Sequence, residues 1–181
     1  EGALKIGELS DFCKKNKIRA VGLSDTSNLC GALEFSESIA KSKTQPIIGT
    51  QINFEYKGTI GKLPLFAKDL TGYKNLIKLS SKSFLDAETI SDPHCKFDNL
   101  EESSQGLIIF TGSFDGLIGK LFLKNLTDEI IVLLKKINEK FKNNFYIEIQ
   151  RHNDEGEKSF ENFLLEVSNK LEIPIIATNE V

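Results

Sequence analysis

The residues of this chain that could do chemistry gather where predicted strands end. In folds of alternating strands and helices, functional side chains collect at the carboxyl ends of the strands. Five such ends are polar although the strands before them are apolar: Ser24-Asp25-Thr26, Thr50-Gln51, Thr111-Gly112-Ser113, Gln150-Arg151-His152 and Thr178-Asn179-Glu180. A polar rim of this kind is typical of an active face, and it is also typical of strands that leave a sheet through solvated loops.

The rim carries two carboxylates and an imidazole, those of Asp25, Glu180 and His152. Such groups can take part in catalysis or binding. In a structural interpretation, Asp25 hydrogen-bonds loop amides or caps a helix beginning near Asn28, and His152 is an ordinary polar loop residue.

Other catalytic patterns are absent from the sequence. We find no Ser-His-Asp set at a recognisable spacing, no phosphate-binding P-loop and no dinucleotide fingerprint. The adjacent pair His94-Cys95 has the wrong spacing for a metal knuckle, and we interpret it as incidental.

Hydrophobic spacing predicts the elements that must position the rim. Helices are predicted around residues 9–13 and over 29–40, 72–84, 114–123, 127–141 and 160–171. Strands are predicted over 18–24, 46–54, 63–67, 107–111, 145–149 and 174–178, with a turn at Gly58 and Gly61 and a polar loop from Asp86 to Asn99. Strands separated by helices indicate parallel pairing through right-handed crossovers, and hence an α/β sheet or barrel. We predict one domain over residues 1–181.

Composition narrows the class of protein. The chain has 181 residues, of which 40% are hydrophobic and 27% charged, as in an ordinary soluble domain. It has no apolar run long enough to span a membrane and no signal peptide, and its three cysteines have no close pairing, so we expect a reduced cytoplasmic protein. Because the chain opens at Glu1 and has no Met, we expect it to be a fragment of a longer protein.

The charge of the chain gives no indication of DNA contact by this piece alone. Its net charge is -3, whereas a domain that grips a nucleic acid backbone usually carries a basic patch. The densest basic stretch is Lys135, Lys136, Lys140 and Lys142. These lysines alternate with a helical apolar stripe, so we interpret them as a solvated helix face.

Several separate runs together resemble the PHP (polymerase and histidinol phosphatase-like) domain of bacterial DNA polymerase III alpha subunits. They occur in the family's order and cover almost the whole chain: Glu1-Gly2-Ala3-Leu4, AVGLSDTSNLCGALEF, QPIIGTQI, DLTGYKNLIKLSSKSFL, GLIIFTGS, FYIEIQRH and PIIATNEV. The resemblance implies a distorted (β/α)7 barrel, incomplete at its N-terminus if the family's first strand precedes Glu1. A sheet without that strand would have an exposed edge with which neighbouring molecules could pair.

In intact members of this family, the barrel mouth holds up to three metal ions. The resemblance places Glu1, His152 and Glu180 at ligand positions, with Asp25 beside the site. It places Thr26, Gln51 and Ser113 where intact members have a histidine, a glutamate, and a cysteine or histidine. Since hydroxyls and amides are weak neutral donors, we expect a vestigial site in this fragment, with no catalytic residue and no bound cofactor.

The resemblance also implies a function for the parent chain. That chain would carry out template-directed DNA synthesis with Mg²⁺ at carboxylates beyond Val181, contacting DNA outside this domain. The domain itself would be a non-catalytic scaffold that stabilises the polymerase and docks the proofreading exonuclease subunit within the holoenzyme. The alternatives are phosphoesterase or 3'-5' exonuclease activity in the barrel and, against the runs GALEF and YIEIQRH, a free-standing phosphatase of the histidinol phosphatase type.

Overall fold

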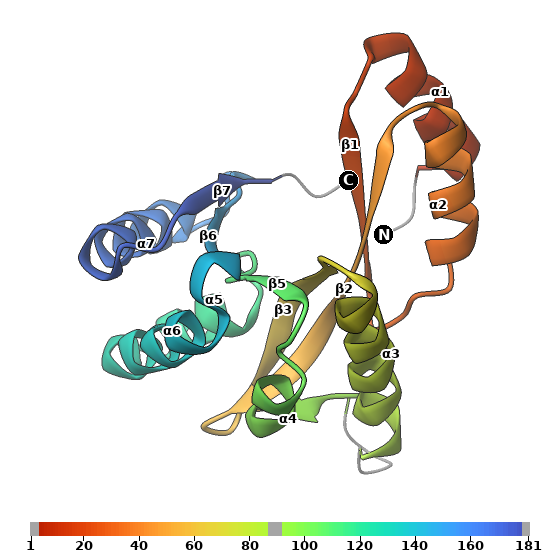
Figure 1. Cartoon of the computed structure of the whole chain (residues 1–181). Coiled ribbons are helices and arrows are strands. Elements are labelled where there is room, and N and C mark those ends of the chain that lie inside the picture. Colours follow the sequence, from red (N-terminus) through yellow and green to blue (C-terminus); the bar gives the residue numbers. More distant parts are fainter. Residues whose placement is uncertain (1–3, 87–91, 179–181) are drawn as a thin grey trace.

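The computed structural model describes residues 4–86 and 92–178 as a curled sheet with helices packed on its outer face (Figure 1). In chain order, the helices are α1 (Ile6–Asn16), α2 (Ala32–Lys41), α3 (Leu70–Leu85), α4 (Phe97–Glu102), α5 (Leu117–Leu123), α6 (Thr127–Phe141), the short 3-10 helix η1 (Lys142–Asn144) and α7 (Glu157–Leu171). The strands are β1 (Ala20–Thr26), β2 (Gln45–Tyr56), β3 (Thr59–Ala67), β4 (Cys95–Lys96), β5 (Leu107–Phe110), β6 (Phe145–Ile149) and β7 (Ile175–Ala177).

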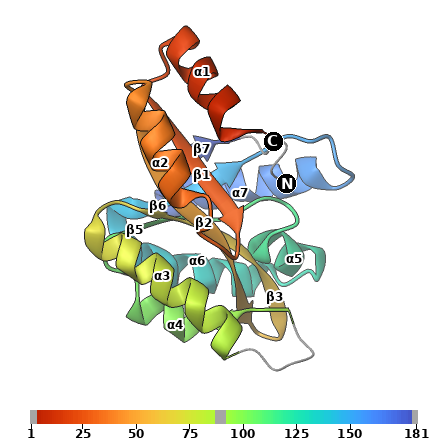
Figure 2. The same cartoon turned by 90° about the vertical axis from the view of Figure 1, so that its right-hand side faces the viewer.

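The strand order in the sheet is β1-β2-β3-β5-β6-β7, with β4 paired to β2 beside this path. β1 is parallel to β2, and β5, β6 and β7 are parallel to one another, as the sequence predicts. The helices α1 and α2 lie along β1 and β2, whereas α5, α6 and α7 lie beside β5, β6 and β7 (Figures 1 and 2). This half-barrel confirms the predicted distorted barrel.

Parallel pairing, which was expected of strands that a helix separates, is wrong for β5 and the preceding strand β3. This strand is antiparallel to both of its neighbours, β2 and β5. The physical reason is the short turn at Lys57 and Gly58, whose φ angles are 50° and 68°, because so short a connection can only join antiparallel strands. Gly61, which was predicted in the turn, lies inside β3, where a Cβ would come within 2.5 Å of the Leu117 backbone.

Two hydrophobic cores cover the outer face of the sheet, and β2 contributes to both. The small core consists of Cys13, Phe35 and Ile39, with Ile48 of β2 packed against it. The large core includes Ile52 and Phe54 of β2 together with apolar residues of β3, β5, β6 and helices α3 to α7. Because side chains alternate along a strand, the inner face carries a different set, which includes the aromatic row Phe66, Phe110 and Tyr146.

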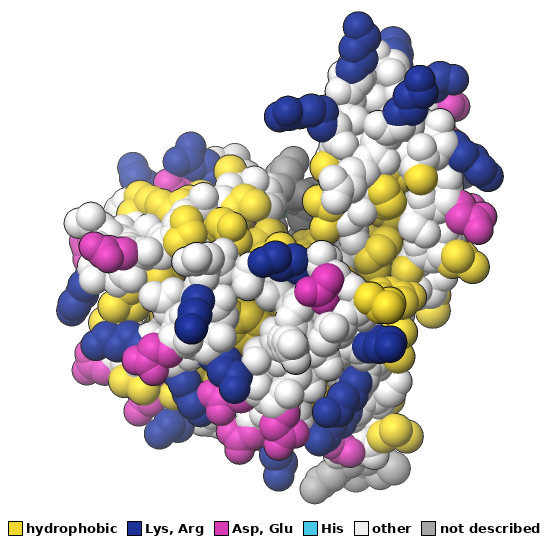
Figure 3. All heavy atoms as spheres, viewed as in Figure 1, with side chains coloured by type: hydrophobic (Ala, Val, Ile, Leu, Met, Phe, Trp, Pro, Cys, Tyr) yellow, Lys and Arg dark blue, Asp and Glu magenta, His cyan; other side chains and the backbone are white. Residues whose placement is uncertain are grey.

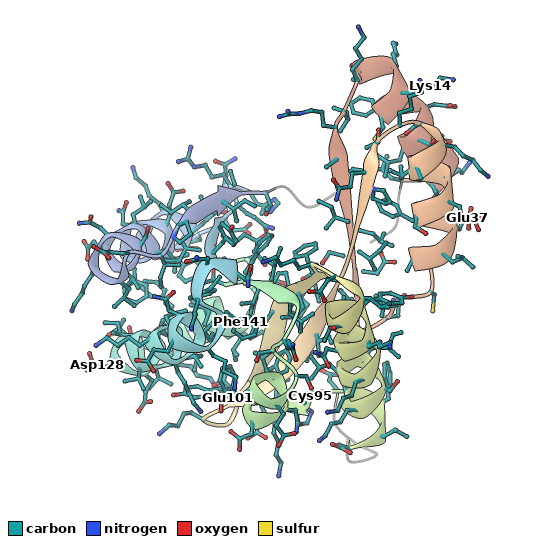
Figure 4. All side chains as sticks on the ribbon, in the orientation of Figure 1. Lys14, Glu37, Cys95, Glu101, Asp128 and Phe141 are labelled. Carbon is teal, nitrogen blue, oxygen red and sulfur yellow. The ribbon has the colours of Figure 1, made fainter. Side chains whose placement is uncertain are left out.

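The predicted loop over residues 86–99 is partly ordered structure. Its last residues form β4 and the start of α4, while residues 87–91 lie outside the described part of the chain. Cys95, labelled in Figure 4, is buried against the C-terminal half of α3, where its thiol donates to the Leu79 carbonyl oxygen at 3.4 Å. Burial raises the pKa of this thiol to about 11. A strand as short as β4 has no periodicity from which the sequence could predict it.

One basic residue of α6, Lys136, makes side-chain contacts within the described part of the chain. The Lys136 ammonium lies 3.0 Å from Glu101 of α4 and 5.4 Å from the centre of the Phe97 ring. These contacts agree with a solvated helix face. Within residues 4–86 and 92–178, no helix combines the length and the apolar composition that crossing a membrane requires.

Helix α3 is held against the sheet by a close approach of two glycines. Asp69 caps the helix by accepting a hydrogen bond from the Gly72 amide at 2.9 Å. A Cβ added at Gly72 would lie 1.8 Å from the Gly106 carbonyl oxygen, and that oxygen already accepts from the Lys68 amide. Only a residue without a side chain fits between the helix and the residues that lead into β5.

We expect Gly72→Ala to lower the free energy of unfolding by about 3 kcal/mol, since the backbone itself must move to accommodate the methyl group. Gly7→Ala in α1 is the matched control, because nothing lies within 4 Å of a Cβ there. That change should stabilise the protein by about 0.5 to 1 kcal/mol through helix propensity. Urea denaturation measures both effects, and equal effects at the two sites would contradict the close approach.

The sheet ends at β1 and β7, each of which has a single strand neighbour within the described residues. β1 has no Lys, Arg or Pro, the residues that protect an edge strand, and its Ala20 and Gly22 are exposed. We therefore expect the chain to associate at high concentration through β1 and Ala20→Lys to weaken that association. Val132→Lys on the exposed face of α6 adds the same charge elsewhere. Light scattering over a concentration series tests this, and a clean monomer at high concentration would count against it.

Candidate functional site at the sheet's polar rim

The parallel pair β1 and β2 brings three of the predicted site residues together. Asp25 and Thr26 lie opposite Thr50 and Gln51 in the register of the two strands. The Gln51 side-chain amide donates to the Ser24 carbonyl oxygen at 3.4 Å, and its backbone carbonyl accepts from the Ser27 amide at 2.8 Å. At this corner the side chains of Thr26 and Gln51 are neutral, and the one carboxylate is that of Asp25.

Of the two alternatives for Asp25, capping of a helix near Asn28 is wrong, because α2 begins only at Ala32. Gly31 is the N-cap residue of α2 and receives no side-chain hydrogen bond. Asn28 orders the intervening loop instead. It accepts from the Cys30 amide and donates to the Thr26 carbonyl oxygen, each at 3.0 Å.

Ser113 follows β5 and belongs to a charged group that the sequence did not indicate. Its hydroxyl donates to the Asp115 carboxylate, which lies 3.3 Å from the Lys62 ammonium. The Lys62 side chain is only 18% exposed, so a cation is held at the rim by the fold itself. Burial alone would raise the pKa of Asp115, but the Ser113 hydrogen bond and the Lys62 charge hold it below its ordinary value.

Lys62 could have been found by strand alternation. Leu63 and Leu65 of β3 point into the large core, so the intervening position and Lys62 face the inner side of the sheet. The sequence alone did not place this strand antiparallel. The neighbourhood of Lys62 and Ser113, which are 51 positions apart in the chain, therefore became visible only in the structure.

A buried carboxylate, Glu148, lies at the end of β6 and was also missed. Its side chain accepts hydrogen bonds from the Thr178 hydroxyl and, at 3.2 Å, from the Gln150 amide. The Gln150 amide also donates to Thr178 at 3.0 Å, and the Thr111 hydroxyl accepts from the Glu148 backbone amide at 2.9 Å. In the sequence Glu148 is one polar residue of an alternating strand, and nothing indicates that its side chain is buried.

His152 lies beyond β6 in a loop that two glutamates hold in place. Its ring nitrogen Nε2 is 3.2 Å from the Gln150 side-chain oxygen, and the residue is exposed. The Glu157 carboxylate accepts from the backbone amides of His152 and Asn153, both at 2.8 Å, and these bonds lower its pKa. Arg151 forms a two-pronged ion pair with Glu161, at 2.7 and 3.0 Å.

A small cleft opens between the ends of β5 and β6 and helix α7. It is lined by Gly112, Ser113, Phe114, Glu148, Ile149, Gln150, Glu157, Phe160, Glu161 and Leu164. Within residues 4–86 and 92–178, no three His, Cys, Asp or Glu side chains lie close enough together to hold a metal ion. Glu1 and Glu180, the two remaining predicted ligands, lie outside the described residues.

Comparison with known proteins shows to which family this fold belongs. The family model described as the PHP domain matches residues 1–152. The chain belongs to the PHP domain family. Among solved structures, a protein provisionally described as a metal-dependent phosphoesterase from Bifidobacterium adolescentis superposes with a TM-score of 0.63. It covers 97% of this chain and 82% of its own, at 12% sequence identity, and therefore shows a shared fold alone.

This PHP domain is also similar to part of several curated bacterial polymerases. The DNA polymerase III alpha subunits of Rickettsia bellii, Caulobacter vibrioides and Vibrio cholerae are 37%, 33% and 33% identical over 180, 189 and 184 residues. These matches cover 99 to 100% of the chain but only 15 to 16% of the relatives. The chain thus corresponds to the PHP domain region of DNA polymerase III alpha and spans about one sixth of the length of those polymerases.

The ion pair at the rim makes stability depend on pH. A carboxylate whose pKa is lowered in the folded state stabilises the protein above its unfolded pKa of about 3.9, and this contribution is lost as the pH falls through the folded value. We expect Asp115→Asn to lower the free energy of unfolding at pH 7 by about 0.5 kcal/mol, because the carboxylate is more than half exposed and water screens the pair.

The difference between Asp115→Asn and the unsubstituted chain should shrink as the pH falls below about 3.9 and should be lost once the pH lies below the folded pKa of Asp115. Asp154→Asn removes an exposed carboxylate that has no side-chain partner within the described residues, so it serves as the control. Urea denaturation at several pH values measures both. A loss that does not change with pH would show that Asp115 acts through packing and not through its charge.

Proposed function

We propose that this chain is the PHP domain of a replicative DNA polymerase III alpha subunit whose barrel mouth is non-catalytic. In this role the domain stabilises the polymerase and docks the proofreading exonuclease subunit. The parent chain carries out template-directed DNA synthesis with Mg²⁺ at a polymerase site outside this domain. It binds DNA there and works with the other holoenzyme subunits.

The observation that carries this proposal is the donor set of the three neighbouring strands β1, β2 and β3. Thr26 and Gln51 lie side by side in the strand register and offer a hydroxyl and an amide. On the next strand, the Lys62 ammonium is paired with Asp115 beside Ser113. Neutral donors bind divalent metals weakly, and a fixed ammonium repels them, so this side of the mouth disfavours a multi-metal cluster.

A metal-dependent phosphoesterase or 3'-5' exonuclease is the second candidate. The observation that favours it is the other side of the mouth, where the Glu148 carboxylate is buried and His152 is hydrogen-bonded to Gln150. Carboxylates and imidazoles are suitable metal ligands, and a metal held there would supply activated water. The Thr178 and Gln150 hydrogen bonds already use one Glu148 oxygen, which supports a structural role for this carboxylate over a role as metal ligand.

Metal content and exonuclease binding together test the assignment. The full-length protein, incubated with Zn²⁺ or Mn²⁺ and then desalted, should retain no stoichiometric metal in its PHP domain by elemental analysis. The double variant Thr26→His/Gln51→Glu, which supplies an imidazole and a carboxylate at adjacent register positions, should gain retained metal. The variant Thr26→Asn/Gln51→Asn is its matched neutral control.

The same protein should bind the proofreading exonuclease subunit of its own organism equally well with and without a chelator, as measured by calorimetry. Two or more ions retained by the unsubstituted PHP domain would overturn the non-catalytic assignment. Loss of exonuclease binding in the chelator would show that a metal supports the docking surface. If the protein has no affinity for the exonuclease subunit, the proposed scaffold role is wrong.

A further inference from the structure

Helix α3 presents an apolar stripe to solvent on the side that faces away from the sheet. Leu70, Ile77 and Phe84 form this stripe, and their side chains are 68%, 44% and 56% exposed. They are spaced seven residues apart, so they lie above one another along about 21 Å of helix. The inner residues Leu76 and Leu79 already anchor α3 in the large core, so the stripe is not needed for packing among the described residues.

The charged side chains within α3 itself have one sign. The sequence of α3 contains three lysines and neither Asp nor Glu. Lys82 pairs with Asp86 at 3.8 Å, whereas Lys74 and Lys78 form no ion pair with any described residue. In Figure 3 hydrophobic side chains and lysines lie together over the flank of the molecule where α3 runs. The surface of α3 is therefore apolar along one line and cationic beside it.

We propose that this α3 stripe docks an acidic amphipathic helix of a protein partner. A seven-residue repeat matches a helix that runs alongside at a shallow crossing angle and places its own apolar seam against Leu70, Ile77 and Phe84. Acidic residues flanking that seam would meet Lys74 and Lys78. Apolar burial supplies the affinity, and the complementary charges set the orientation and select the partner.

Other occupants fit the same surface less well. A second copy of this chain would bring the lysines of one α3 against those of the other, at a cost in like-charge repulsion. A DNA backbone is recognised by cations and polar groups, and it leaves three exposed apolar side chains without a contact. The stripe uses no residue of the barrel mouth, so it is independent of whether the mouth binds metal.

The test uses the full-length protein and a fluorescent 21-residue designed helix with Leu at the seam and Glu at the flanking positions. We expect saturable binding in fluorescence anisotropy. Ile77→Ser and Phe84→Ser should each weaken it about tenfold, the loss that corresponds to 1.4 kcal/mol. A peptide with the same seam but Lys at the flanks should bind at least about tenfold more weakly than the peptide with Glu. In the Lys78→Glu variant, the affinities of the two peptides should differ less.

Val132→Ser on α6 is the matched control, because Val132 is also 56% exposed but lies on another helix. It should leave binding unchanged. Circular dichroism confirms that all variants are folded, as expected for changes at exposed positions. The proposal is overturned if the acidic peptide does not bind, or if Ile77→Ser and Phe84→Ser have no more effect than Val132→Ser. It is also overturned if the stripe variants instead abolish dimerisation in sedimentation, or binding to a DNA duplex or to anionic vesicles.

Discussion

Strand β2 is the element on which the rest of the structure depends, because it links the two hydrophobic cores. Its first half packs Ile48 against the small core under α1 and α2, and its second half buries Ile52 and Phe54 in the large core. β2 also pairs with β1, β3 and β4, so the parallel and antiparallel parts of the sheet meet on this strand. Continuous pairing along β2 fixes the register of the rim residues on both of its sides.

The antiparallel strand β3 determines the chemistry of the barrel mouth. In a strictly parallel sheet, every strand brings its carboxyl end to the same rim. β3 runs the other way, and it brings Lys62 from its interior toward Ser113 and Asp115. The mouth is thereby divided into a cationic and neutral side on β1, β2 and β3 and an acidic, hydrogen-bonded side on β6 and β7 around Glu148. This division is the observation on which the proposed structural role of the mouth depends.

Much of the fold could be predicted from local patterns. The helix over Thr127–Phe141 and the strand over Phe145–Ile149 have the predicted bounds, because strong periodicity reflects burial on one face. The antiparallel direction of β3 was not predicted, and the turn at Lys57 and Gly58 determines it. The close approach of Gly72 to Gly106 could not be predicted either, because it joins residues far apart in the chain. At the rim, the neighbourhood of Asp25, Thr26 and Gln51 followed from parallel pairing. Lys62, Asp115 and Glu148 required the three-dimensional arrangement.

The small core beneath α1 and α2 has a consequence for the dynamics of the molecule. Only Cys13, Phe35 and Ile39 are fully buried there, and β1 is joined to the remaining sheet through β2 alone within the described residues. Such a layer opens at a lower free energy than the global transition, as a separate cooperative unit. Amide hydrogens of α1, β1 and α2 should therefore exchange with solvent sooner than those of β3 and β5, and each opening would transiently release Thr26 from Gln51. The side of the mouth on β1 and β2 would then open more often than the other side, in addition to differing from it in charge.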